Sequence, residues 1–231
     1  MSHSAMVKAA RMFAVYGFPV FRFDFSGCGD SEGELQSVLV DDWQQDLACA
    51  IDFFRQKTGI TQCLLWGLRL GAGLALMHER SSKEIFGLIL WQPVLDFSIH
   101  IKQFLRQSIS SRIVRGKKDE TRSPTDNDLQ YDGITHVNGY PITRDLCESF
   151  NKIGNQPESI IPSVPLFLLT VSSMEEPSFL LKKYAHRLDE AGLQVTFQHA
   201  TADPFWDRYW QWECREAAEA TLQWLQDNCE S

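Results

Sequence analysis

Apolar side chains recur along most of the chain with the spacing of alternating helices and strands. Between residues 39 and 57 they fall three and four positions apart, which predicts a helix with one buried stripe: Trp43, Leu47, Ala50, Ile51 and Phe54. The pattern also predicts helices over 3–16 and Leu70 to Glu79, and strands at Pro19 to Phe25, Gln62 to Trp66 and Phe86 to Trp91. Such alternation is typical of a mostly parallel sheet with helices on both faces.

The alternation stops after Pro93 and returns near residue 165. Helical spacing continues at Ile101, Phe104, Leu105, Ile109 and Ile113, and a polar, turn-rich segment, 116–136, follows it. We therefore expect an α/β core from residues 1–96 and 156–231, interrupted by an inserted lid at 97–155. The rest of the core is predicted as a strand at Pro165 to Val171, a helix over 177–190, a strand at Gln194 to Gln198 and a last helix over 213–227.

Composition narrows the class of protein. The 231 residues are 44% hydrophobic, which suffices for one large core, and the net charge of −8 disfavours nucleic acid and anionic membranes. No apolar stretch reaches the roughly 20 residues of a membrane span, and nothing resembles a signal peptide. The six cysteines have no C-x-x-C spacing, so we expect them to be reduced. We predict a cytoplasmic protein with no membrane span and no nucleic-acid partner.

One short motif bears on whether the chain has a catalytic nucleophile. Trp66-Gly67-Leu68-Arg69-Leu70-Gly71 follows an apolar strand and opens a stretch of small residues, which predicts a sharp turn from strand to helix. Many hydrolases have G-x-S-x-G at such a turn, and its serine is the nucleophile. Here both glycines are present, and arginine replaces the serine.

The motifs together resemble the α/β-hydrolase superfamily over nearly the whole chain. Residues 24–33 look like its D-x-x-G-x-G-x-S-x-G turn, and Leu88 to Pro93 look like the strand that ends in proline before the lid. More closely, three segments resemble the exosortase A system-associated hydrolase 2 family: residues 66–71, 102–107 (Lys-Gln-Phe-Leu-Arg-Gln) and 204–206 (Pro-Phe-Trp). This resemblance implies a bacterial protein associated with exopolysaccharide biosynthesis proteins, and an ester or acyl substrate. It also implies that two or three N-terminal strands are missing before Met1, unless the chain is a short natural form.

The resemblance assigns places to a serine triad, and this chain departs from them. Arg69 holds the place of the nucleophile, although a guanidinium cannot act as one. Glu175 is a weak, shifted candidate for the acid, and Pro204 stands in the turn where the histidine is expected. His199 lies nearby, but a lone histidine at a strand end is more often structural.

Other nucleophiles and cofactors have little support. Ser26, Cys28 and Ser31 alternate with turn glycines and have no histidine near them in sequence, so turn chemistry explains them better than catalysis. The remaining histidines form no metal-binding pattern, and no phosphate-loop or dinucleotide motif occurs. The sequence therefore predicts neither a metal nor a cofactor.

Arg69 itself has two interpretations, and both stay open. It is neutralised in a structural salt bridge by Asp24, Asp30, Glu175 or Asp203, or it forms an anion-binding site with the first backbone N–H groups of the helix at Leu70.

Three function classes follow from this replacement. The first is a catalytically degenerate binder of an acidic or acyl small molecule, because two expected catalytic side chains are replaced. The alternative is an active ester or acyl hydrolase, or an acyltransferase, with relocated catalytic residues. A third is an interaction subunit for biosynthetic enzymes.

Overall fold

The computed structural model describes residues 2–80, 82–114, 133–137, 139–206 and 215–229. They form two compact units. One, the sheet unit, comprises Met1–Arg22, Thr58–Pro93 and Ile161–Ser231. The other, the hairpin unit, comprises Phe23–Lys57 and Val94–Ile160. Most of the polar segment expected at 116–136 lies outside the described residues, as do Cys214 and the side chains of Ile109 and Ile113. The lid role of residues 97–155 stays a prediction.

The sheet unit is built on four parallel strands in the order β1-β2-β5-β6. These strands are β1 (Cys63–Leu68), β2 (Ile85–Trp91), β5 (Leu166–Ser172) and β6 (Val195–Thr201). The helices are α1 (Ser2–Val15), α3 (Leu70–Glu79), α8 (Phe179–Glu190) and α9 (Arg215–Asn228). The predicted parallel sheet with helices between its strands is confirmed, and α3 has the bounds expected from sequence.

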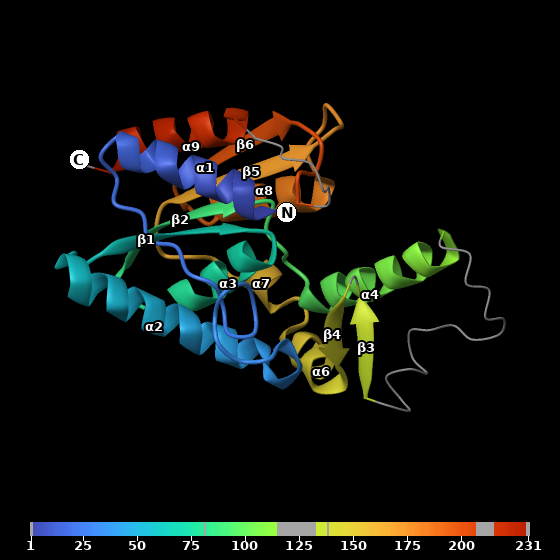
Figure 1. The fold of residues 1–231 in the computed structure, drawn as a ribbon. Helices are drawn as coiled ribbons and strands as arrows, with labels where there is room; N and C mark the ends of the chain where they lie inside the picture. Colours follow the sequence, from blue (N-terminus) through green and yellow to red (C-terminus); the bar gives the residue numbers. More distant parts are fainter. Residues whose placement is uncertain (1, 81, 115–132, 138, 207–214, 230–231) are drawn as a thin grey trace. The chain divides into compact units, whose positions relative to one another are not determined.

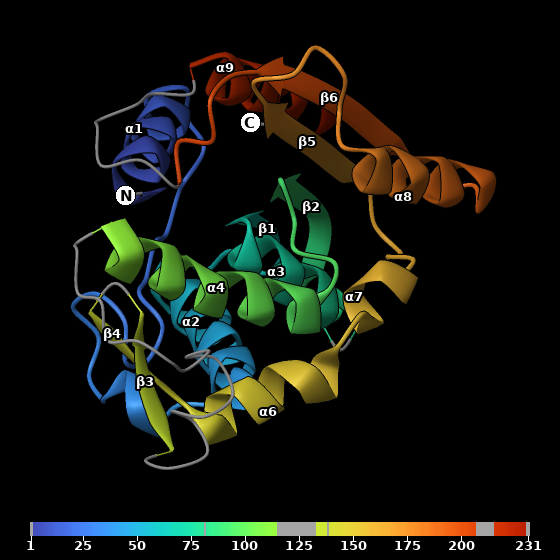
Figure 2. The same ribbon diagram turned by 90° about the vertical axis from the view of Figure 1, so that its right-hand side faces the viewer.

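Alternate residues along β2 and β5 are buried on opposite faces of the sheet, as the period of a strand requires. Ile89, Trp91, Phe167 and Leu169 join one apolar cluster with side chains of α1 and α9. Their strand neighbours Leu88, Leu90 and Leu168 have no exposed surface. Figures 1 and 2 show α1 and α9 side by side on one face and α3 on the other, where it packs against β1 and β2. The carboxyl ends of β1 and β2 are therefore fixed from both faces.

The hairpin unit contains mostly helices: α2 (Val40–Thr58), α4 (Phe97–Val114), α6 (Arg144–Ile153), the short α7 (Gln156–Ser159) and the 3-10 turn η1 (Leu35–Ser37). Thr143 caps α6 by accepting a hydrogen bond from the Leu146 N–H at 3.1 Å. The unit also holds an antiparallel hairpin that the sequence analysis did not predict, β3 (Ile134–Val137) and β4 (Tyr140–Thr143). Its strands are too short to give a clear period, although the Asn-Gly pair before Tyr140 is a hairpin signal.

The strand predicted at Pro19 to Phe25 is wrong. They form no strand in the structure and pair with none of the four parallel strands that it describes. Val20 and Phe21 are exposed. β-Forming side chains are not sufficient for a strand, because its backbone N–H and C=O groups must also find a neighbouring strand.

Candidate functional site at the strand-to-helix turn

The predicted sharp turn is present at the end of β1. β1 ends at Leu68 and α3 begins at Leu70, so Arg69 alone forms the corner, with φ 54° and ψ −117°. Gly67 is required by close approach, because a Cβ atom on it would lie 2.5 Å from the Ala72 nitrogen and from the Gly71 carbonyl. The turn therefore has the strained geometry that a nucleophile elbow needs, with a cation at its tip.

Arg69 is held through both its backbone and its side chain. Its N–H donates to the Trp91 carbonyl at 2.9 Å, and its own carbonyl accepts from the first turn of α3. The guanidinium Nη1 donates to the Gln92 carbonyl at 3.4 Å. Its Cζ lies 5.2 Å from the centre of the Trp206 ring, which is cation–π range. The side chain does not cap α3 with a hydrogen bond.

A chain of aromatic contacts supports this cation. Trp206 packs edge-to-face with Phe205 at 5.1 Å, Phe205 meets Trp91 at 6.4 Å, and Trp91 meets Trp66 at 5.1 Å between ring centres. The buried Trp91 donates its indole N–H to the Thr221 hydroxyl of α9 at 2.9 Å. The structure thus brings the Pro-Phe-Trp segment, singled out from sequence, to the arginine of the turn.

The proposed salt-bridge partners of Arg69 fall in different places. Asp203 belongs to the same unit as Arg69 and is half-buried, whereas Glu175 of that unit is exposed. Asp24 and Asp30 belong to the hairpin unit. There the Asp24 carboxylate accepts the Asp30 N–H at 3.2 Å, so it supports its own turn. The salt-bridge interpretation of Arg69 stays a prediction.

His199 is engaged at both ring nitrogens. Its Nε2 lies 3.0 Å from the Met174 carbonyl, which can only accept, so Nε2 is the donor. In the neutral ring, Nδ1 is then the acceptor of the Thr170 hydroxyl at 2.7 Å. A hydroxyl on a histidine is a nucleophile–base geometry, but Thr170 has no exposed surface and no substrate can reach it. These bonds support the structural interpretation of His199.

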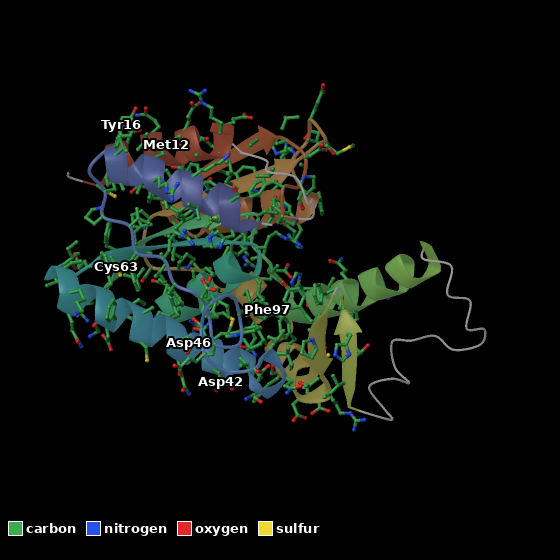
Figure 3. The ribbon with its side chains drawn as sticks, in the orientation of Figure 1. Met12, Tyr16, Asp42, Asp46, Cys63 and Phe97 are labelled. Atoms are coloured by element: carbon green, nitrogen blue, oxygen red, sulfur yellow. The ribbon has the colours of Figure 1, made fainter. Side chains whose placement is uncertain are left out.

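The glycine-rich turn of residues 24–33 is held by its own hydrogen bonds. Ser26 donates both its N–H and its hydroxyl to the carboxylate of Asp46, at 2.8 and 2.9 Å. Figure 3 marks Asp46 on α2, one turn from Asp42. The Ser31 hydroxyl donates to the Asp24 carbonyl at 2.5 Å. Burial raises the pKa of the Cys28 thiol, and the charges of Asp24 and Asp46 raise it further, so it stays protonated and weakly nucleophilic at neutral pH. Sequence reasoning missed Asp46, because only the fold brings α2 to the turn.

Among the side chains that the structure describes, no three His, Cys, Asp or Glu residues gather closely enough to hold a metal ion. Within the same residues, no helix is both long and apolar enough to cross a membrane.

Comparison with known proteins identifies the family of the chain. Residues 2–138, more than half of the chain, match the family described as serine aminopeptidase, S33. Protein ABHD12B of Homo sapiens is 25% identical over 144 residues, which are 55% of this chain and 38% of that protein. The chain therefore spans about two fifths of the length of this curated relative.

Solved structures share the fold at low sequence identity. The structure of Est1E from Butyrivibrio proteoclasticus, with ferulic acid bound, has a TM-score of 0.67 and 13% identity, covering 96% of this chain and 82% of that one. The monoacylglycerol lipase of Paleococcus ferrophilus has a TM-score of 0.59 and 19% identity, covering 94% and 87%. The predicted α/β-hydrolase fold is thereby confirmed.

Proposed function

Because the chain belongs to the serine aminopeptidase family, S33, of the α/β hydrolases, we propose that it is a catalytically degenerate member that binds an acidic or acyl small molecule at Arg69. The observation that carries the proposal is the arginine at the strained tip of the nucleophile turn. A guanidinium keeps its positive charge at any working pH and cannot attack a carbonyl. The turn thus has the geometry of a nucleophile elbow, with a cation in the place of the nucleophile.

The surroundings of Arg69 suit an anion. The first turn of a helix has N–H groups without intrahelical acceptors, here beginning at Leu70, and the helix dipole adds a partial positive charge. The guanidinium supplies forked donors that match the shape of a carboxylate or phosphate. The half-buried Trp206 ring adds apolar surface beside it. A carboxylate with an acyl or aromatic tail fits this combination best.

The probes follow from this chemistry and from two neighbours in fold. The Est1E structure holds ferulic acid, an aromatic carboxylic acid, and the Paleococcus ferrophilus neighbour is a monoacylglycerol lipase. We therefore choose ferulate and octanoate. A cytoplasmic location and an association with exopolysaccharide biosynthesis proteins, as in the exosortase-associated family, remain part of the proposal.

Arg69→Ala should weaken the binding of octanoate or ferulate by about tenfold or more, because one charge-assisted hydrogen bond contributes about 1.5–3 kcal/mol. Arg69→Lys should restore only part of the affinity, since the lysine ammonium lacks the paired, planar N–H donors of the guanidinium. Isothermal titration calorimetry measures the affinity of both variants and of the unmodified protein. Repeated at high salt, it should show weaker binding to the unmodified protein, because salt screens the charge of Arg69. Arg80→Ala is the matched control, because Arg80 is exposed at the far end of α3. If Arg69→Ala keeps the affinity but lowers the melting temperature, the salt-bridge interpretation is correct.

A fluorophosphonate probe should leave the protein unlabelled, because its candidate hydroxyls are not activated. Ser26 donates to a carboxylate, Ser31 donates to a carbonyl, and Thr170 is buried. Intact-mass spectrometry after incubation measures this result, with an active serine hydrolase as the positive control. A labelled serine, located by peptide mapping, would favour the alternative of an active hydrolase or acyltransferase with relocated residues.

A further inference from the structure

Two residues other than glycine have positive φ in the part of the chain that the structure describes. They are Arg69, at 54°, and Gln92, at 44°. They follow the paired strand ends Leu68 and Trp91, so they are neighbours across the carboxyl edge of the sheet. A residue other than glycine is strained in this region and persists there only where other interactions hold it.

Three hydrogen bonds hold Gln92 in this conformation. Its N–H donates to the Leu169 carbonyl at 2.7 Å. Its side-chain Oε1 accepts the Val171 N–H at 2.7 Å. Both partners belong to β5, so the residue is fixed to the next strand through its backbone and its side chain. The third bond is accepted by its carbonyl, from the Arg69 Nη1.

The strained conformation decides where that carbonyl points. The Trp91 carbonyl receives the Arg69 N–H, and the Gln92 carbonyl receives the Arg69 side chain, so consecutive residues hold both parts of the arginine. If φ at Gln92 relaxed to a negative value while its N–H stayed on Leu169, the rest of the residue, including the carbonyl, would turn away. The bond from Val171 prevents this relaxation.

We propose that Gln92 is a positioning residue for Arg69: its side chain, bound to β5, holds a strained backbone whose carbonyl aims the guanidinium. The effect on ligands rests on the proposed function, in which Arg69 receives the carboxylate. Gln92 contacts the cation through its carbonyl, so we expect it to act on affinity through Arg69. Sequence reasoning could not find it, because glutamine after a strand has no distinguishing signal.

The test follows the Nε–H resonance of Arg69 in the full chain, assigned by its loss in Arg69→Lys. We expect Gln92→Ala to shift this resonance, to speed its exchange with water and to weaken octanoate binding by about fivefold. In an Arg69→Ala background, Gln92→Ala should have no further effect on octanoate binding. Gln198→Ala, at an exposed position of β6, is the control and should change neither. If Gln92→Ala does not fold, Gln92→Asn replaces it, because asparagine tolerates positive φ and its shorter amide does not reach Val171.

The outcomes separate this inference from the proposed function. If the Gln92 variants lower the melting temperature but leave the Arg69 resonance unchanged, Gln92 only braces the sheet and the inference is wrong. If octanoate fails to bind, or binds equally to Arg69→Ala, the proposed function is wrong. The positioning role is then decided by the Arg69 resonance alone.

Discussion

Gly67→Ala should destabilise the protein by about 3 kcal/mol, at the upper end of the cost of overpacking and a large share of the stability of an ordinary domain. The added methyl group would lie 2.5 Å from the Ala72 nitrogen and from the Gly71 carbonyl carbon and oxygen. All three are backbone atoms at the start of α3, so no side chain can rotate away. The chain can relieve the contact only by moving the helix away from β1, which would break the bonds that hold Arg69. Urea unfolding followed by circular dichroism measures the loss.

Gly71→Ala provides the matched control within the same motif. A Cβ on Gly71 meets nothing within 4 Å, and the residue lies in the first turn of α3. Alanine there should stabilise the protein by about 0.5–1 kcal/mol, because it restricts the unfolded chain more than glycine does. The two glycines of the G-x-R-x-G motif thus differ in role. Equal losses in the two variants would show that the turn has another geometry.

The sequence predicted the regular elements of the sheet unit closely because their signals are local. The apolar run before Trp66 and the small residues after Gly71 define β1, the turn and α3. The strand expected at Pro19 to Phe25 failed because pairing depends on a distant partner that local propensity does not contain. The hairpin at Ile134 to Thr143 was missed for a different reason: its strands are too short to show the alternation of a strand.

In the candidate site too, the residue with a local signal was predicted, and the residues joined only by tertiary contacts were not. Arg69 was predicted at the tip of the turn because the spacing of Gly67 and Gly71 is a local signal. The stack of Trp206 on its guanidinium depends on residues far apart in the chain, which only the folded sheet unit brings together. Gln92 and Asp46 were missed because their hydrogen bonds, to Arg69 and Ser26, have no pattern in the sequence. Local patterns therefore identified the unusual residue, and tertiary contacts identified what holds it.

Trp91→Ala should destabilise the protein by about 3–5 kcal/mol, the usual cost of removing a large buried aromatic side chain. The indole is only 1% exposed and contacts the rings of both Trp66 and Phe205. Its N–H also bonds Thr221, which links β2 to α9. Because Phe205 supports Trp206, the loss should also loosen the ring that stacks on Arg69.

Trp91→Phe separates the two contributions of this side chain. It keeps an aromatic ring in the cluster but removes the hydrogen bond to Thr221, so the expected loss is smaller, about 1–2 kcal/mol. Octanoate titration of Trp91→Phe should give an affinity close to that of the unmodified protein, since Phe205 retains an aromatic neighbour. Circular dichroism is the suitable probe of unfolding, because tryptophan fluorescence would change with the substitution itself. A loss below about 1 kcal/mol in Trp91→Ala would contradict the buried cluster beneath the turn.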